Sequence, residues 1–425
     1  MKTSRLIKTA LIILFGLIFW NYFSGISSVP FHPDESTQIF MSSDAATNPI
    51  NLAYEPSQVL DNRTRYRLID SPITRLLIGW GLVLLGEKNN PADWNWAASW
   101  DENVSAGALP SDSALQTARL SVAWLFPFSC LFLFLLAKKL SGTPIAVLTA
   151  ILFSTNALVL IHTRRAMAES ALICTFCALV WILVDDKKTV WISSLAAGLA
   201  INSKQTTFPV VFIGFLTTYL LPLNTNLWKK IARAGLFLIL ILVISGLLNP
   251  VFWKHPLDAI REGTAQRADL SSRMREDYRT SMDFFEQTIF LVAHTFIQPP
   301  AIADVLNYQD ETLEAERNYL REPFNNLFRG FAGGSIMLFL TIAGWIIFVK
   351  QAAAKIYVER IRLLIFTAIT IASIFSLMMF TAAPFQRYYI ILVPLFSISQ
   401  ATALLFLGSA AVDGIKKWVT WKGNP

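Results

Sequence analysis

The residues best suited to chemistry are two adjacent carboxylates, Asp34 and Glu35, in the run His32-Pro33-Asp34-Glu35. They follow shortly after the first long hydrophobic stretch, residues 6–24. If that stretch crosses a bilayer, the carboxylates lie where it reaches the outer aqueous phase, within reach of a lipid head group. Asp34 is the candidate general base. A pair of solvated loop acids is the structural alternative.

Four cations could complete the same site by holding an anionic phosphate. Arg164 and Arg165 lie on the side of the membrane that usually lacks basic residues, and a guanidinium fork suits phosphate. Glu169 follows closely enough to pair with either arginine, so a structural Arg–Glu bridge at a helix end is the alternative. Lys204 and Arg387 each lie at the outer end of a hydrophobic block, where snorkelling to the head-group layer is the alternative.

The next two residues, Tyr388 and Tyr389, either line an entrance for lipid or belong to an aromatic belt. No Asp-x-Asp pair occurs, and the histidines lack the spacing of metal ligands, so metal-independent chemistry without a cofactor is expected. No glycine-rich phosphate loop and no nucleic-acid module is present, so a nucleotide is not expected as the direct donor, nor nucleic acid as a partner. An activated group would have to arrive on a lipid.

The composition of the chain indicates which kind of secondary structure positions these residues. Of 425 residues, 54% are hydrophobic and 15% charged, and the hydrophobic residues form blocks of roughly 20, the length of a helix that crosses a bilayer. The sequence therefore predicts an all-α polytopic membrane protein forming a single domain over residues 1–425. Cys130, Cys174 and Cys177 fall inside the blocks and are expected to be buried apolar side chains. The ten predicted spans are 6–24, 117–137, 143–161, 167–184, 189–202, 207–223, 234–248, 329–349, 361–381 and 388–408.

Orientation follows from the basic residues of the short connections. Lys and Arg concentrate in 2–8, 138–139, 187–188, 229–233, 350–362 and 416–422. Because such residues favour the cytoplasmic side, both termini are predicted to be cytoplasmic. The first span begins with Lys2, Arg5 and Lys8 and is expected to remain as an uncleaved anchor. The net charge of +7 reflects this topology.

Two long segments, 25–116 and 249–328, are then predicted to be external. The first is acidic and contains Ile73–Leu85, an apolar stretch too short to span and better suited to an interfacial helix. Trp94, Trp96 and Trp100 follow it, as in an aromatic belt at head-group level. The second segment contains Phe284–Gln298, an apolar run interrupted by polar residues that also indicates an interfacial helix.

An anchor, an Asp-Glu pair, a long first external loop and many spans together resemble the GT-C glycosyltransferases. Within them the chain is most similar to the protein O-mannosyltransferase and aminoarabinose-transferase branch of phospholipid-carrier-dependent enzymes. The resemblance implies a GT-C fold and an inverting glycosyltransferase of the cell membrane. It also implies that Asp34 is the catalytic carboxylate of the Asp-Glu pair. Four stretches carry it, in this order: Phe31-His32-Pro33-Asp34-Glu35, Thr163-Arg164-Arg165-Ala166-Met167-Ala168-Glu169, Asn202-Ser203-Lys204-Gln205 and Gln386-Arg387-Tyr388-Tyr389.

Chemistry leads to a similar expectation. A polyprenyl-phosphate sugar needs a base at the attacking hydroxyl and positive charge at the departing phosphate. Asp34 is then the base, and Glu35 holds an acceptor, the donor sugar or a basic partner. The acceptor stays open between a glycolipid, a cell-wall polymer and a protein. The rival functions are a lipid-carrier transporter or flippase and a non-catalytic subunit of a membrane glycan assembly. The non-catalytic subunit predicts that Asp34 is dispensable.

Overall fold

The computed structural model describes residues 2–185, 189–221, 225–277, 283–301, 309–354, 357–380 and 383–422, and every regular element in these ranges is helical. The predicted all-α class is confirmed. The α-helices are α1 (Lys2–Ser24), α2 (Pro33–Met41), α3 (Asn62–Ile69), α4 (Ile73–Leu85), α5 (Trp100–Ser105), α6 (Asp112–Ala123), α7 (Leu125–Ser141), α8 (Thr143–Ser154), α9 (Ala157–Arg164), α10 (Ala168–Leu183), α11 (Val190–Ile201), α12 (Phe208–Leu220), α13 (Leu227–Leu248), α14 (Pro256–Asp277), α15 (Phe284–Val292), α16 (Gln309–Arg321), α17 (Gly330–Ala354), α18 (Tyr357–Phe380) and α19 (Val393–Lys422).

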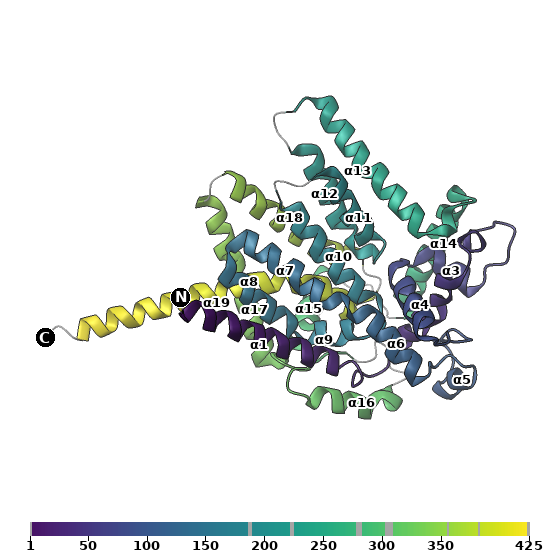
Figure 1. Ribbon diagram of the computed structural model, residues 1–425, viewed down its shortest axis with the longest axis horizontal. Coiled ribbons are helices and arrows are strands. Elements are labelled where there is room, and N and C mark those ends of the chain that lie inside the picture. The colour runs from purple at the N-terminus through teal and green to yellow at the C-terminus, as the bar shows by residue number, and fades with distance from the viewer. Residues whose placement is uncertain are drawn as a thin grey trace.

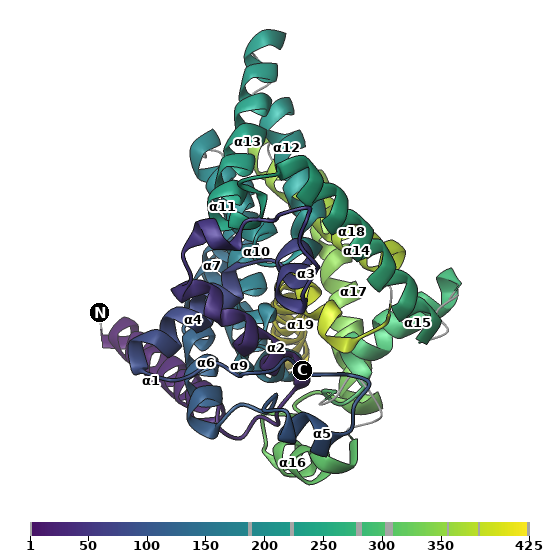
Figure 2. The same cartoon turned by 90° about the vertical axis from the view of Figure 1, so that its right-hand side faces the viewer.

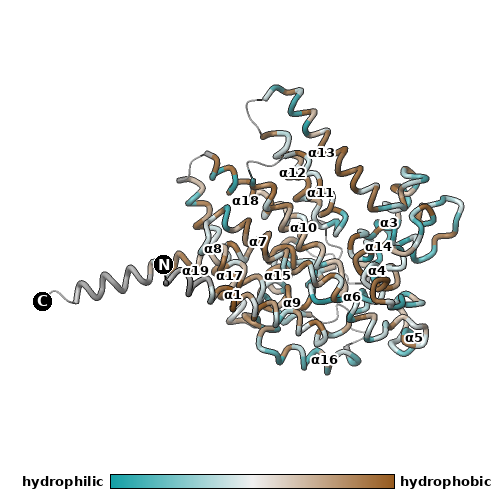
Figure 3. The backbone as a smooth tube through the Cα atoms, viewed as in Figure 1, coloured by the Kyte–Doolittle hydropathy of each residue, from teal (hydrophilic) through white to brown (hydrophobic). Residues whose placement is uncertain are grey.

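The helices form one bundle with a polar end (Figure 1). Helices α3, α4, α5 and α14 gather at the right of Figure 1, whereas α1 begins and α19 ends at the left. Figure 3 shows hydrophobic chain through the middle of the bundle and hydrophilic chain in α3, α14 and α16. The segment that contains Asp34 therefore lies at the end of the molecule opposite to both termini.

Each predicted span falls on a helix or on two consecutive helices, but the count of ten spans is not confirmed. Five described helices are long and apolar enough to cross a membrane, or six if the bent pair α8–α9 is one span. Helices α10, α11 and α12 have 16, 12 and 13 residues, fewer than the ~20 that a perpendicular crossing needs. The number of full crossings therefore stays a prediction.

The predicted span 143–161 is broken. Helices α8 and α9 meet at an angle of 60°, and the side chain of Asn156 caps the second by accepting from the backbone N–H of Leu158 at 3.0 Å. An asparagine at a helix N-cap satisfies the free N–H groups that a break creates. Because of this bend, the end of α9, where Arg164 and Arg165 lie, is next to α1.

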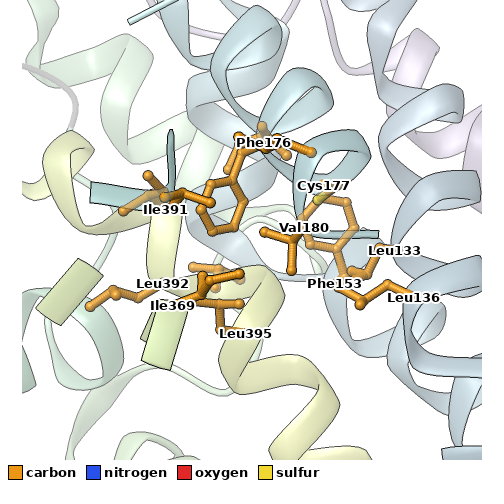
Figure 4. Close-up of a cluster of buried hydrophobic side chains, with 14 of the residues drawn as sticks. Leu133, Leu136, Phe153, Phe176, Cys177, Val180, Ile369, Ile391, Leu392 and Leu395 are labelled. Carbon is orange, nitrogen blue, oxygen red and sulfur yellow. The ribbon is translucent and has the colours of Figure 1, made fainter. Parts of the chain in front are cut away.

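The main core lies between α7, α8, α10, α18 and α19 (Figure 4). Phe176 and Val180 of α10 face Phe153 of α8, and all three are fully buried. Cys177 belongs to this cluster, and Cys130, Cys174 and Cys177 are buried free thiols, as predicted. The core also includes part of a 3-10 helix that directly precedes α19, η7 (Gln386–Leu392). Core packing therefore fixes the backbone that carries Arg387.

The three tryptophans of the first long segment lie in one cluster, and their place in an aromatic belt stays a prediction. Trp94 is 2% exposed and packs with Phe31, Trp96 and Trp100 in a small separate core. The ring centroids of Phe31 and Trp94 are 5.5 Å apart, and those of Trp94 and Trp100 are 5.3 Å apart. Neighbouring chain buries the ring of Trp94, whereas the rings of Trp96 and Trp100 are partly exposed. Phe31, the residue directly before His32, belongs to this cluster.

The two predicted interfacial helices exist as short apolar helices. Helix α4 has the predicted bounds, Ile73–Leu85, with Leu82 buried and Leu84 exposed. The stretch Phe284–Gln298 forms α15 and then a π-helical turn, η5 (Ala293–Ile297). Figure 2 shows α15 at one flank of the molecule, far from α1, and α2 in the middle of the polar end between them.

Candidate active site

Local sequence explains the orientation of Asp34. His32 is the N-cap of α2 and Pro33 its first residue, a position that suits the fixed backbone of proline. The Nδ1 atom of His32 accepts from the N–H of Asp34 at 3.1 Å, and a Glu35 oxygen accepts from the N–H of His32 at 3.0 Å. This capping box fixes both carboxylates on the first helical turn. His32 therefore has the local hydrogen-bonding role of a cap.

Glu35 is a positioning residue in this structure. It is fully buried, and Arg119 donates to its two oxygens from Nε and Nη2, each at 2.8 Å. Burial acts to raise the pKa of Glu35, but the Arg119 guanidinium, Arg165 and the N–H of Ala166 outweigh it, and the pKa is lowered. Of the roles predicted for Glu35, the structure shows the basic partner; its burial leaves no surface for an acceptor or a sugar.

Arg119 was not identified from the sequence. It lies in α6, is 1% exposed, and donates from Nη1 to the carbonyl oxygens of Ile26 and Val29 at 3.1 and 2.8 Å. It therefore ties the connection between α1 and α2 to α6. Sequence gives no sign of this contact, because the ion pair joins residues 84 positions apart.

Asp34, unlike its neighbour, is open to solvent and faces a cation from the other end of the chain. Its side chain is 32% exposed, and its Oδ2 accepts from Nη1 of Arg387, whose side chain is 10% exposed. The predicted base and one predicted phosphate-binding cation therefore meet across 353 positions of sequence. The guanidinium carbon of Arg387 also lies 5.2 Å from the ring centroid of Phe385.

Lys204 joins this group through Tyr388. Its Nζ lies 5.3 Å from the ring centroid of Tyr388, and the guanidinium carbon of Arg387 lies 5.6 Å from the same centroid. Lys204 pairs with Glu169, which is 1% exposed, so the prediction that Glu169 pairs with Arg164 or Arg165 is wrong. A cation–π contact and a buried carboxylate hold Lys204 beside Arg387.

The arginine pair is buried and serves as an anchor. Both side chains have no exposed surface. Arg164 donates from Nε to the carbonyl of Tyr22 at 3.0 Å and from Nη1 to Oδ1 of Asn325 at 2.9 Å, and Arg165 donates from Nε to the carbonyl of Pro30 at 3.2 Å. In the described structure the carbonyl groups of Tyr22 and Pro30 and the side chain of Asn325 accept from the two arginines, and their contact with a phosphate stays a prediction.

The remaining predicted residues differ in exposure. Tyr388 is partly exposed beside the cations, whereas Tyr389 is 4% exposed and stacks on His294 at a centroid distance of 5.5 Å. Tyr389 therefore belongs to the core. Gln386 is 1% exposed and donates to the carbonyl of Pro299 at 3.0 Å. Together these two residues hold η7 against the segment that follows α15.

A second carboxylate, Asp93, lies near Asp34 and was missed. It accepts from the hydroxyl groups of Tyr66 at 2.8 Å and Thr37 at 2.9 Å. Burial raises the pKa of Asp93, the two hydroxyl groups act against that shift, and the charge of Asp34 adds to it. Thr37 lies one helical turn after Asp34, so the same face of α2 carries both contacts. The sequence alone does not single out Asp93, which is one of several acids in the segment 25–116.

No metal-binding group of three or more His, Cys, Asp or Glu side chains comes together within the ranges that the structure describes. The described site instead consists of single carboxylates, each with a cation or hydroxyl groups as partners. Its open part is made by Asp34, Arg387, Lys204 and Tyr388.

Comparisons with known proteins agree with this architecture. Residues 111–249 match the family model described as dolichyl-phosphate-mannose-protein mannosyltransferase. The structure is similar to that of ArnT from Cupriavidus metallidurans in the apo state, with a TM-score of 0.52 and 13% identity over 93% of this chain and 60% of that one. The chain thus spans less than two thirds of that protein. No curated protein sequence matches it.

Solved structures of an archaeal oligosaccharyltransferase also match at lower scores. AglB from Archaeoglobus fulgidus, in complex with an inhibitory peptide and a dolichol-phosphate, gives a TM-score of 0.44 and 11% identity over 93% of this chain and 48% of that one. Residues 111–249 thus match the mannosyltransferase family model, and the fold of the chain is similar to that of ArnT.

Proposed function

We propose that the chain transfers a sugar from a polyprenyl-phosphate carrier to an acceptor hydroxyl, with Asp34 as general base and Arg387 and Lys204 as the cations at the carrier phosphate. The observation that carries the proposal is the meeting of Asp34 with Arg387 in an accessible position. Lys204 lies on the same tyrosine ring as Arg387. A base beside two cations is the arrangement that displacement of a phosphate from an anomeric carbon requires.

The transfer proceeds in one displacement. The acceptor oxygen forms a bond to the anomeric carbon while the bond from that carbon to the phosphate oxygen breaks, and the bonding electrons leave with the phosphate. The hydroxyl proton passes to the Asp34 carboxylate. Attack opposite to the leaving group inverts the anomeric configuration. Arg387 and Lys204 stabilise the charge that grows on the phosphate.

The ion pair of the unliganded site gives binding a defined first step. When a carrier phosphate enters, Arg387 can exchange the Asp34 carboxylate for a phosphate oxygen, and Asp34 Oδ2 is then available to the acceptor hydroxyl. Charge-assisted contacts of an arginine with carboxylate and with phosphate are of similar strength, so the exchange needs little net energy. Glu169 keeps Lys204 in place during the exchange.

A lipid-linked donor is supported by the family description, which names a dolichyl-phosphate sugar. The acceptor remains a class with three members: a glycolipid, a cell-wall polymer or a protein. The external face is supported by the basic short connections and by the position of Asp34 at the end opposite to both termini. A cysteine introduced at Asp61 should react with a membrane-impermeant thiol reagent in intact cells; protection there would place the site on the cytoplasmic side.

The test is Asp34→Asn, which retains size but cannot accept the proton. Loss of general-base catalysis typically lowers a rate about 10²–10⁴-fold, so cells with this variant should accumulate the polyprenyl-phosphate sugar, detected by mass spectrometry of lipid extracts. Asp112→Asn, an exposed acid at the start of α6, is the matched control and should not accumulate it. Turnover by Asp34→Asn within about threefold of wild type would reject the base and favour a transporter or a non-catalytic subunit.

A further inference from the structure

Helix α14 presents one face to the polar end of the bundle, beside α3 (Figure 1). Ala259 and Gly263 of this face are buried, and Arg267 follows them at the same spacing of four residues, which keeps it on the same side of the helix. The proposed transfer assigns no role to these residues.

The contact of α14 with α3 is close enough to depend on a glycine. A Cβ added at Gly263 would lie 2.9 Å from the carbonyl oxygen of Leu68, closer than real side chains approach such an atom. Ala259 packs in the same small core as Leu68 and Ile69. The face of α14 is therefore seated directly on the end of α3.

One glutamine joins both helices to the turn that carries Lys204. Gln205, the next residue in the chain, donates from Nε2 to the carbonyl of Ile69 at 2.9 Å. Its Oε1 accepts from Nε of Arg267 at 3.1 Å and from Nη2 of the same side chain. Both ends of the Gln205 amide are thus engaged, one by α3 and one by α14.

The electrostatics of Asp70, which ends α3, bring the same two cations together. Burial raises the pKa of the Asp70 carboxyl above its ordinary value, and the charges of Arg267 and Lys204 are among those that act against the shift. Both cations are therefore near one carboxylate. Arg267 is close to Lys204 in space as well as through the glutamine.

Lys204 requires support of this kind because its side chain is long and flexible. Ordering a lysine side chain costs conformational entropy. Its ammonium group pairs with Glu169 and lies against the ring of Tyr388, but these contacts hold the tip in place only if the backbone of residue 204 keeps its position. The hydrogen bonds of Gln205 supply that constraint.

We propose that Arg267 is a positioning residue for Lys204, acting through Gln205, so that α14 is needed for binding of the carrier phosphate without touching it. This inference rests on the proposed function, in which Lys204 meets that phosphate. An arginine that only fastened α14 to the bundle would affect the stability of the protein and would not affect recognition of the phosphate in particular.

The experiment compares the binding of polyprenyl phosphate with that of the uncharged polyprenol. Each lipid is titrated into the full chain, purified in detergent, and bound lipid is counted by native mass spectrometry. Arg267→Ala and Gln205→Leu should each weaken binding of polyprenyl phosphate about three- to tenfold, the range expected for the loss of one or two hydrogen bonds, and leave binding of polyprenol unchanged. Arg267→Lys, which retains the charge and one donor, should cause a smaller loss. Unchanged binding of polyprenyl phosphate by Arg267→Ala, or an equal loss for both lipids, would overturn the proposal.

A double variant tests whether the effect passes through Lys204. If it does, adding Arg267→Ala to Lys204→Ala should cause no further loss of polyprenyl phosphate binding. Full addition of the two losses would overturn the positioning role and leave the proposed phosphate contact of Lys204 intact. A Lys204→Ala chain that binds polyprenyl phosphate as well as wild type would instead remove that contact from the proposed function, and this inference with it.

Arg273 provides the matched control on the same helix. It is exposed and pairs with Asp269 of α14 at 2.7 Å. Arg273→Ala removes one cation from α14 and should leave the binding of both lipids unchanged. A loss of polyprenyl phosphate binding equal to that of Arg267→Ala would assign the effect to the positive charge of α14 as a whole and overturn the positioning role.

Discussion

Asp34 and Glu35 are neighbours in sequence, yet replacing each by its amide should impair a different property of the protein. Glu35→Gln leaves the buried guanidinium of Arg119 without its counter-ion and with one acceptor in place of two oxygens. Removing one partner of a buried ion pair costs about 3–5 kcal/mol. Asp34→Asn breaks a partly exposed pair and should cost about 1 kcal/mol or less. Stability should therefore fall with the first change, and catalysis with the second.

The assay records the unfolding midpoint of purified variants and the transfer rate per folded molecule at a temperature where each is folded. Glu35→Gln should unfold at a clearly lower temperature and retain much of its transfer rate. Asp112→Asn is the control for loss of one acid.

Two results would refute this reasoning. A Glu35→Gln protein as stable as wild type would mean that the Arg119 pair contributes little to the fold. A stable, folded Glu35→Gln protein whose transfer rate fell as far as that of Asp34→Asn would give Glu35 a direct role at the substrate. In either case the difference between the two neighbouring acids would have to be explained by something other than their burial.

Three further predictions concern the cations and the pH. Arg387→Ala and Lys204→Ala should each lower donor-dependent kcat/KM about ten- to a hundredfold, and unchanged donor titrations would show that they do not meet the phosphate. Arg164→Lys, which loses buried contacts to carbonyl groups, should lower the unfolding midpoint in a thermal scan without a selective change in donor KM. The folded pKa of Glu35 lies below its ordinary value of 4.5, so its stabilisation is complete above that pH and is lost as the pH falls below it. Unfolding midpoints measured from pH 7 to pH 3 should therefore fall more steeply for wild type than for Glu35→Gln.

The sequence predicted the class of fold and the open half of the site. Hydrophobic blocks locate helices because a bilayer demands them, and the basic Arg387 at a helix end is conspicuous for the same reason. The count of ten spans stays a prediction, because apolar blocks such as α11, with 12 residues, are shorter than a perpendicular crossing needs. Hydropathy reports an apolar environment without stating whether lipid or protein provides it.

The buried contacts of the site could not be predicted from the sequence, for a different reason. Arg164 and Arg165 are charges that a pattern can identify, but whether such a charge meets a ligand or a backbone carbonyl depends on contacts such as that to Asn325, 161 positions away. Arg119 and Asp93 act through equally distant partners. A single sequence specifies residue types and local spacing, and it carries no record of which distant segments touch.

The separation of Asp34 from Arg387 has a consequence for the making of the protein. During synthesis the carboxylate leaves the ribosome 353 residues before its guanidinium partner, which follows only after most of the described helices. Any nascent or truncated chain that stops before residue 387 lacks this ion pair, however well its earlier helices fold. Assembly of the pair thus coincides with arrival of the last helix, so a partly built chain cannot present a finished site to the lipids around it.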